Sequence, residues 1–200
     1  MKKRKSHNAS TSTKATKAIM YLVFIIYIMV LLKVILFKNA NITQIINWDV
    51  AGKHLYNLVP FASVKQLWQM ESRSLIWKLS QIAGNVLVFL PLGYMVPLLF
   101  KNMRRFGKVL LLSFGISLVF ELMQYLFGLG CMDVDDLILN LIGGVLGYGA
   151  YRLLAQICKT EKALYTTTLI LVVLCAILAF IVAKTVFGMD LDFNSVAIPF

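Results

Sequence analysis

Two groups of polar side chains interrupt the apolar runs in the second half of this chain. The first pairs a carboxylate with an amide, Glu121 and Gln124, which share one face of a helix because they are three residues apart. The second group lies beside the next apolar run and consists of Asp133, Asp135, Asp136 and Asn140. An ionisable side chain inside a membrane is costly unless it faces a partner or water, so such residues indicate a functional site.

These residue types fit catalytic chemistry and structural roles alike. Glu121 in an apolar setting could act as a general acid or base, and Asp133 with Asp135 or Asp136 could hold a divalent cation bound to a phosphate. The structural alternative for Glu121 and Gln124 is a hydrogen-bonded clamp between helices. The structural alternative for the aspartates is capping of a helix start by Asp135 or Asp136, although one cap does not need three aspartates.

The composition predicts a membrane protein. Of the 200 residues, 60% are hydrophobic and 14% are charged, whereas soluble domains are roughly 25% charged. We therefore expect an all-α fold, a polytopic membrane helical bundle. Apolar runs long enough to cross a membrane predict five spans, at about 18–37, 82–100, 109–127, 137–154 and 165–187. Residues 1–17 are expected to form a disordered basic cytoplasmic tail, and residues 18–200 a single membrane domain.

The loop between the first two spans has a mixed composition. It contains Trp48, Trp68 and Trp77, and amphipathic segments with tryptophan commonly lie at the level of the lipid headgroups. We expect one or two interfacial helices there. The second span carries Pro91 and Pro97, each of which removes a helical hydrogen bond.

The net charge of +11 follows from membrane topology and does not indicate nucleic acid as a partner. Lysine and arginine concentrate in the N-terminal tail and in the loops after the second and fourth spans, as they do in cytoplasmic loops. This predicts a multi-pass protein of the cell membrane with its N-terminus in the cytoplasm and its C-terminus outside. Seven polar residues then converge on the outer half of the membrane: Asn85, Glu121, Gln124, Asp133, Asp135, Asp136 and Asn140.

Four blocks of the sequence resemble the VanZ-like family of bacterial membrane proteins, which is named for a member associated with teicoplanin resistance. The blocks are Asn57-Leu58-Val59-Pro60-Phe61, Asn85 to Gly93, Glu121-Leu122-Met123-Gln124, and Asp133-Val134-Asp135-Asp136 with Asn140, Gly143, Gly144 and Gly147. In one place the chain departs from the family pattern, which has an arginine before the aspartate block. Arg73 or Lys78 could replace that arginine.

The resemblance implies a role at the outer leaflet or on cell-envelope precursors, but no catalytic mechanism. We expect the protein to bind a lipidated amphiphile between spans two, three and four, with a membrane lipid or a lipidated antibiotic as its partner. The alternatives are an enzyme acting on a lipid phosphate and a proton-coupled lipid or drug transporter. No cofactor or metal is expected, except a divalent cation under the enzyme alternative.

Overall fold

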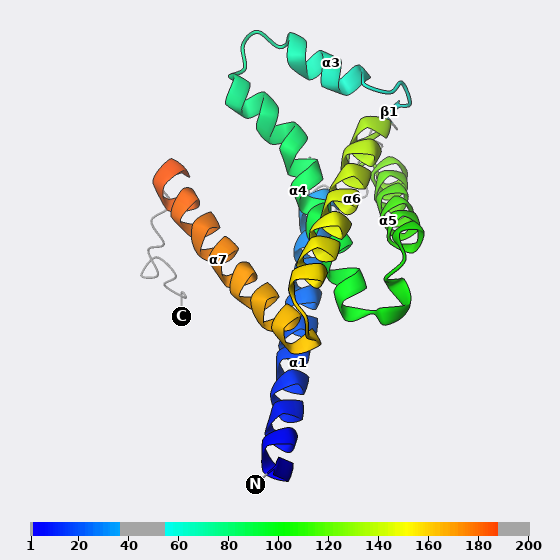
Figure 1. The fold of residues 1–200 in the computed structure, drawn as a ribbon. Helices are drawn as coiled ribbons and strands as arrows, with labels where there is room; N and C mark the ends of the chain where they lie inside the picture. Colours follow the sequence, from blue (N-terminus) through cyan, green and yellow to red (C-terminus); the bar gives the residue numbers. More distant parts are fainter. Residues whose placement is uncertain (1, 37–54, 188–200) are drawn as a thin grey trace, which may run out of the picture. The chain divides into compact units, whose positions relative to one another are not determined.

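A computed structural model of the protein describes the backbone of residues 2–36 and 55–187, and the side-chain surroundings of 14–35 and 55–177. The chain falls into two compact units, Lys17–Ile157 and Met1–Thr16 with Cys158–Phe200, which are described separately. The described helices are α1 (Lys2–Leu36), α3 (Ala62–Gln69), α4 (Leu75–Leu99), α5 (Phe106–Phe127), α6 (Val134–Ile157) and α7 (Glu161–Phe187) (Figure 1). The predicted all-α fold is confirmed.

Four described helices are long and apolar enough to cross a membrane: Lys14–Ile35, Leu75–Leu99, Phe106–Phe127 and Val134–Ile157. They correspond to the first four predicted spans. The predicted fifth span, 165–187, lies within α7, and its membrane crossing stays a prediction. Within α7, the Thr168 hydroxyl donates to the Leu164 carbonyl at 2.8 Å, which satisfies a polar group on an otherwise apolar helix.

Residues 2–17 of the predicted disordered tail are helical and form the start of α1. The residues from Lys2 to Lys17 include neither glycine nor proline, and lysine, arginine and alanine are good helix formers. A helix nucleated in the apolar run can therefore extend back through them. The division into a tail and one membrane domain stays a prediction.

The second span begins earlier than the predicted 82–100. Helix α4 starts at Leu75, where the Ser74 side chain accepts a hydrogen bond from the Trp77 N–H at 3.3 Å and so caps the helix. Polar residues in the first turns lower the local hydropathy, so the apolar run used for the prediction begins later than the helix. Trp77 therefore belongs to a long helix and not to a separate interfacial one, whereas Trp68 lies in α3. Trp48 lies outside the described residues.

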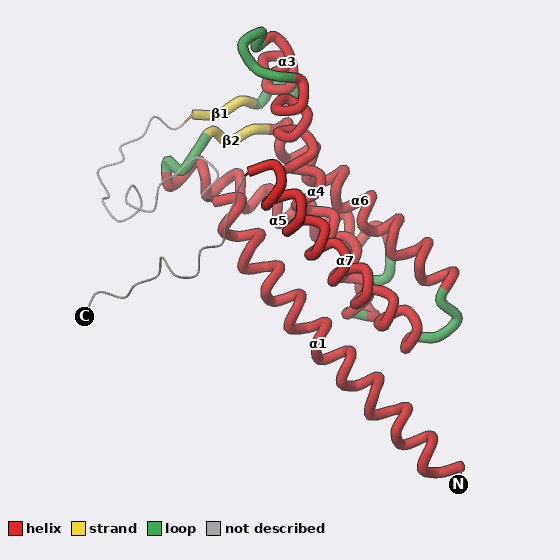
Figure 2. Tube along the Cα trace, turned by 90° about the vertical axis from the view of Figure 1, so that its left-hand side faces the viewer, coloured by secondary structure: helices red, strands yellow, loops and turns green. Residues whose placement is uncertain are grey.

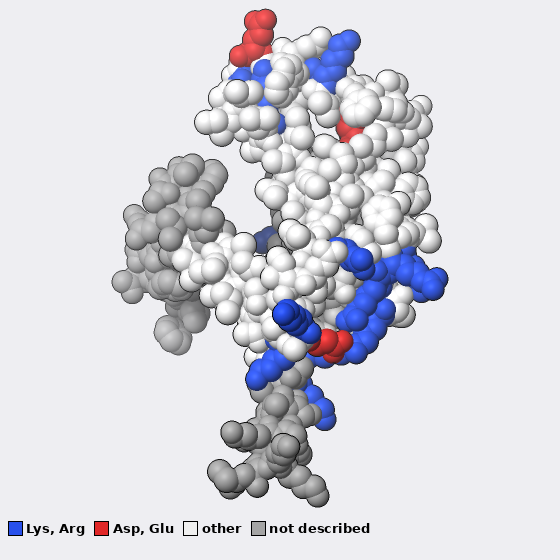
Figure 3. Space-filling view, viewed as in Figure 1, with Lys and Arg blue, Asp and Glu red and all other residues white. Residues whose placement is uncertain are grey.

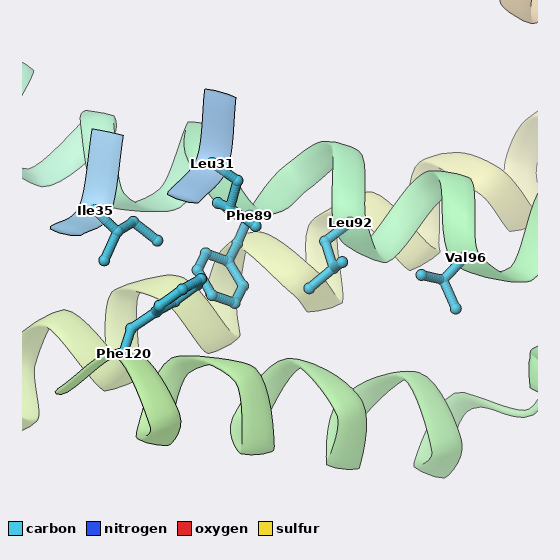
Figure 4. Packing of buried hydrophobic residues seen from close by; sticks show 6 residues of the cluster. All are labelled: Leu31, Ile35, Phe89, Leu92, Val96 and Phe120. Atoms are coloured by element: carbon cyan, nitrogen blue, oxygen red, sulfur yellow. The ribbon is translucent and has the colours of Figure 1, made fainter. Parts of the chain in front are cut away.

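Helices α1, α4 and α5 enclose the apolar core of the larger unit. Figure 4 shows its buried members, which are Leu31, Ile35, Phe89, Leu92, Val96 and Phe120. Tyrosine hydroxyls of α1 also donate to carbonyls of α4, Tyr27 to Val88 at 2.8 Å and Tyr21 to Leu99 at 3.2 Å. Helix α1 is thus held against α4 by both apolar packing and hydrogen bonds.

Helices α4 and α6 have the most extensive contact in the described chain. A methyl group added at Gly143 would overlap the Val86 carbonyl oxygen, and one at Gly147 would overlap the Leu90 carbonyl oxygen. On the other helix, Gly93 is equally close to the Gly144 backbone. These glycines let the two backbones approach closely, as small residues do between membrane helices.

Two short parallel strands, which the sequence reading did not predict, join the loops at one end of the bundle (Figure 2). Strand β1 (Leu55–Asn57) pairs with β2 (Cys131–Asp133), and the register places Asn57 opposite Asp133. The strands bring the segment before α3 beside the segment before α6. Asp133, Asp135 and Asp136 lie at this place.

Candidate functional site

Two adjoining cavities of about 260 Å³ each lie between the ends of the helices and the strands. The first, here called the helix cavity, has polar walls made of Ser80, Gln81, Asn85, Glu121, Gln124, Asp136 and Asn140. The second, the loop cavity, is lined by residues that include Ser63, Trp77, Cys131, Asp133, Asp135 and Asp136. Gln81, Asn85 and Asp136 line both, so the seven predicted site residues surround two neighbouring cavities.

Glu121 is, with Asp135, the most deeply buried carboxylate of this region, with 2% of its surface exposed. Its Oε2 accepts a hydrogen bond of 2.7 Å from the backbone N–H of Asp133. A hydrogen bond to a charged group is worth about 1.5–3 kcal/mol, so this contact offsets part of the cost of burial. It also joins α5 to the end of β2. We did not predict this partner, because a backbone N–H has no signature in the sequence.

Asp133 caps α6. Its Oδ1 accepts from the backbone N–H of Asp135 at 2.9 Å and from the side-chain amide of Asn57 at 3.3 Å. The prediction that Asp135 or Asp136 caps this helix is therefore wrong. The helix starts at Val134 and not near residue 137, and the capping position moves back with it.

Asp135 holds the start of a different helix. Its Oδ1 accepts from the Phe61 N–H, and its Oδ2 accepts from the Val64 N–H at 3.1 Å. Helix α3 has no side-chain cap of its own, and its N-cap residue Phe61 has a left-handed backbone with φ 63°. That conformation is costly for a residue with a side chain. Asp135, which is 2% exposed, stabilises this turn from a position distant in sequence.

Asp136 faces Asn85 across the α4–α6 contact. The Asn85 amide donates to Asp136 Oδ1, and both residues line both cavities. Both residues belong to the seven polar residues that the sequence predicts to converge, and the structure places these two in contact. It places one carboxylate and one amide at the junction of the two cavities.

Gln124 and Asn140 connect helices. Gln124 Nε2 donates to the Ile35 carbonyl of α1 at 2.9 Å, and Asn140 Nδ2 donates to the Ser117 hydroxyl of α5 at 2.9 Å. Both side chains are buried. They therefore act as the interhelical clamps that were one of the sequence-based alternatives, and both also form part of the wall of the helix cavity.

Cys131, in β2, reports on the charge of this region. Burial raises the pKa of its thiol, and the negative charges of Asp133, Glu121 and Asp136 raise that pKa further. Among the described residues, no group of three or more His, Cys, Asp or Glu side chains is arranged to hold a metal ion. The carboxylates of Asp133 and Asp135 are instead directed at N–H donors.

Several residues of the site were missed by the sequence reading. Gln81 and Gly84 line the helix cavity. Gln81 lies just before the predicted start of the second span at residue 82, and Gly84 lies just after it. Gln81 lies one turn before Asn85 on the same helix face, which could have found it once the helix was extended. Arg73 lies over the Trp77 ring at 4.8 Å, and Lys78 Nζ donates to the Trp68 carbonyl at 2.8 Å. Replacement of the family arginine by either residue stays a prediction.

The fold and the buried polar region define a helical membrane protein with several candidate spans. The VanZ/LLP1 family pattern matches residues 24–155, and the chain belongs to this family. It is also similar to Protein VanZ of Enterococcus faecium, with 32% identity over 127 residues that cover 62% of this chain and 67% of that protein. No solved structure matches the chain.

Proposed function

We propose that this protein acts in the cell envelope by binding the polar end of a lipidated amphiphile in the helix cavity, and that it contributes in this way to glycopeptide (teicoplanin) resistance. One observation carries the proposal: the buried carboxylate of Glu121 lines a cavity whose walls combine polar side chains with the apolar Val34, Ile35 and Val88. A site with both kinds of wall suits a molecule with a polar head and an apolar tail.

The size of the cavities limits what they can hold. Each measures about 260 Å³, which is below the range of roughly 300–1,000 Å³ typical of sites for drug-sized ligands. The region therefore suits the head group of a membrane lipid, of a lipid-linked wall component or of a lipidated antibiotic. It is too small for an entire glycopeptide, whose bulk would stay outside the protein.

The charge of the cavities favours a cationic head group. Glu121 and Asp136 both line the helix cavity, and Asp133 and Asp135 line the adjoining loop cavity. An acidic cavity with low-dielectric walls attracts cations more strongly than an exposed acidic surface does. The outer-leaflet location of this region, inferred from the distribution of lysine and arginine, agrees with a ligand that approaches from outside the cell.

The contacts of the aspartates favour binding over catalysis. A phosphate-transferring enzyme would need Asp133 with Asp135 or Asp136 to hold a cation, but the first two carboxylates already accept backbone N–H bonds. Glu121 likewise accepts the Asp133 N–H. A proton-coupled transporter would require Glu121 to gain and lose this bond in each cycle.

The test compares the resistance of cells to teicoplanin and to a glycopeptide without the lipid tail. Cells express no protein, the wild type, Glu121→Ala, Asp136→Asn or Gly84→Leu, the last of which fills the helix cavity at a position where an added Cβ meets nothing within 4 Å. Wild type should protect against the lipidated drug alone, and all three variants should lose this protection while still inserting in the membrane.

Two matched variants serve as controls. Glu71→Gln removes an exposed carboxylate, and Gly149→Leu enlarges an exposed glycine that also has open space around it. Both should protect as well as the wild type. Full protection by Glu121→Ala and Gly84→Leu at wild-type membrane levels would refute the assignment of the cavity. Absence of protection by the wild type would refute the resistance role.

A further inference from the structure

A third hollow in the larger unit differs from the helix cavity in having almost entirely apolar walls. It is a groove of about 760 Å³ between α1 and α5, here called the α1–α5 groove. Its walls are apolar, and they include Leu31, Leu32, Leu112, Ile116 and Phe120. Among the described residues that line it, Lys108 is the one with a charge. A groove with apolar walls and a single cation at one end fits an anionic amphiphile.

The end of the groove at Lys108 lies in a basic surface. Four cations follow one another around the turn between α4 and α5, and Figure 3 shows the band of positive charge that they form: Lys101, Arg104, Arg105 and Lys108. Lys108 Nζ donates to the Asn102 carbonyl at 2.9 Å. Because an ammonium group has three donors, this bond leaves Lys108 able to bind a phosphate oxygen as well.

The start of α5 adds to the attraction for an anion. Its N-cap residue, Arg105, makes no side-chain capping bond to the first N–H groups of the helix. The helix dipole places a partial positive charge at the same point. This feature supports the site that the groove and Lys108 define.

The length of the groove matches one leaflet of a membrane. Between Lys108 and Phe120, α5 rises about 18 Å at 1.5 Å per residue, whereas one half of the hydrocarbon core is about 15 Å thick. An acyl chain that starts at Lys108 would therefore end near Phe120, where the apolar core begins. The groove volume also falls within the range of roughly 300–1,000 Å³ that ligand sites occupy.

We propose that the α1–α5 groove binds an acyl chain of an anionic phospholipid of the bilayer whose phosphate lies at Lys108. The ligand of the acidic helix cavity would carry the opposite charge, so this site is additional to the proposed function and does not depend on it. Removal of Lys108 should weaken binding of the anionic lipid, and obstruction of the groove should weaken binding of any lipid with the same chains.

The test measures lipid retained by the purified full-length protein in neutral detergent, by native mass spectrometry. The probes are phosphatidylglycerol and phosphatidylcholine with identical acyl chains. Wild type should prefer phosphatidylglycerol, and Lys108→Gln should reduce its affinity for that lipid about fivefold, the effect of one cation near a phosphate. Affinity for phosphatidylcholine should fall less, because its choline group offsets the charge of its phosphate.

Obstruction of the groove provides the second part of the test. Gly115 lines the groove, and an added Cβ there meets nothing within 4 Å, so Gly115→Leu enters open space. It should lower retention of both lipids, and Gly115→Met provides a second obstruction if Gly115→Leu elutes differently from the wild type. Lys65→Gln and Gly149→Leu are the matched controls at exposed positions and should behave as the wild type does.

Three results would overturn the proposal. Equal retention of the two lipids by the wild type would remove the evidence for an anionic ligand. A loss in Lys108→Gln no larger than the loss in Lys65→Gln would remove Lys108 from the site. Wild-type retention by both Gly115 variants would show that the bound lipid lies outside the groove.

Discussion

Four carboxylates, those of Glu121, Asp133, Asp135 and Asp136, lie within one small region of the protein. Like charges so close together are tolerated when each carboxylate faces hydrogen-bond donors. Backbone N–H groups supply the donors for the first three, and the Asn85 amide supplies one for Asp136. The region is thus an acidic site held in place by the backbone of its own loops, and Cys131 lies next to it.

The thiol of Cys131 can measure the charge of this region. Because burial and then the charges of Asp133, Glu121 and Asp136 raise its pKa, its reaction with a maleimide should reach half its maximal rate above the ordinary pH for a cysteine. Glu121→Gln and Asp136→Asn each remove one negative charge and should move this midpoint downward, since a lower pKa gives more thiolate at a given pH. The measurement uses a variant with Cys158→Ser and Cys175→Ser.

Removal of a negative charge elsewhere gives the control for this titration. Glu71→Gln changes an exposed carboxylate that is absent from the causes of the Cys131 shift, so it should leave the midpoint unchanged. A midpoint that is equally unaffected by Glu121→Gln and Asp136→Asn would contradict the prediction. It would mean that these carboxyl groups carry no charge beside the thiol.

At the scale of elements, α3 is positioned by a residue of α6. The bonds from Asp135 to the N–H groups of Phe61 and Val64 tie the start of α3 to the start of α6. Asp135→Ala should leave two N–H groups without their acceptor and destabilise the turn by about 1–3 kcal/mol. Hydrogen exchange of the amides between Leu55 and Gln69 should accelerate, while exchange in α4 stays slow.

Two further substitutions serve as comparisons for this exchange measurement. Asp135→Asn keeps one acceptor oxygen and should give an intermediate exchange rate. Glu71→Ala, at an exposed acid in the turn after α3, should leave exchange at Phe61 and Val64 as it is in the wild type. Unchanged protection of these two amides in Asp135→Ala would refute the capping role.

The contact between α4 and α6 depends on glycines at a few defined positions. Gly143→Ala should push the helices apart, because the new methyl group meets the Val86 carbonyl oxygen. Such overpacking costs about 1–3 kcal/mol and should lower the Tm of the purified protein. Gly149→Ala faces open space on the same helix and should maintain or raise the Tm, since alanine favours a helix by about 1 kcal/mol over glycine. Equal effects of the two substitutions would contradict close packing at Gly143.

The sequence predicted the helices better than the contacts between them. Long apolar runs define α4, α5 and α6 to within a few turns because hydrophobic length is a strong signal. The predicted start of α4 was too late, because hydropathy does not register the Ser74 cap. The sequence identified the residue types of the site, but assigned α6 capping to the wrong aspartate. The strand pairing of Asn57 with Asp133 could not be predicted from the sequence, because three-residue strands carry almost no periodic signal.

At the scale of the whole molecule, charge is distributed between two kinds of surface. The turn between α4 and α5 carries the basic band described above, whereas the acidic cavities lie at the opposite ends of the same helices, beside α3. If basic loops stay in the cytoplasm, the cavities face the outside of the cell. The resistance proposal and the lipid proposal then concern opposite leaflets, and the resistance proposal depends on this orientation.

Labelling of single cysteines in intact cells tests the orientation directly. In a background without the three native cysteines, Ser72→Cys between α3 and α4 should react with a membrane-impermeant maleimide, because we expect this turn to lie outside. Asn102→Cys, in the basic turn, should react only after the membrane is permeabilised. Both positions are exposed, so the side of the membrane and not burial decides the result.

The same labelling tests the fifth span: Ser195→Cys should label from outside if α7 crosses the membrane, and from inside if it does not. Labelling of Asn102→Cys in intact cells would show that the topology is the reverse of the predicted one. The band of Lys101, Arg104, Arg105 and Lys108 would then face the exterior, and the acidic cavities could not receive a ligand from outside.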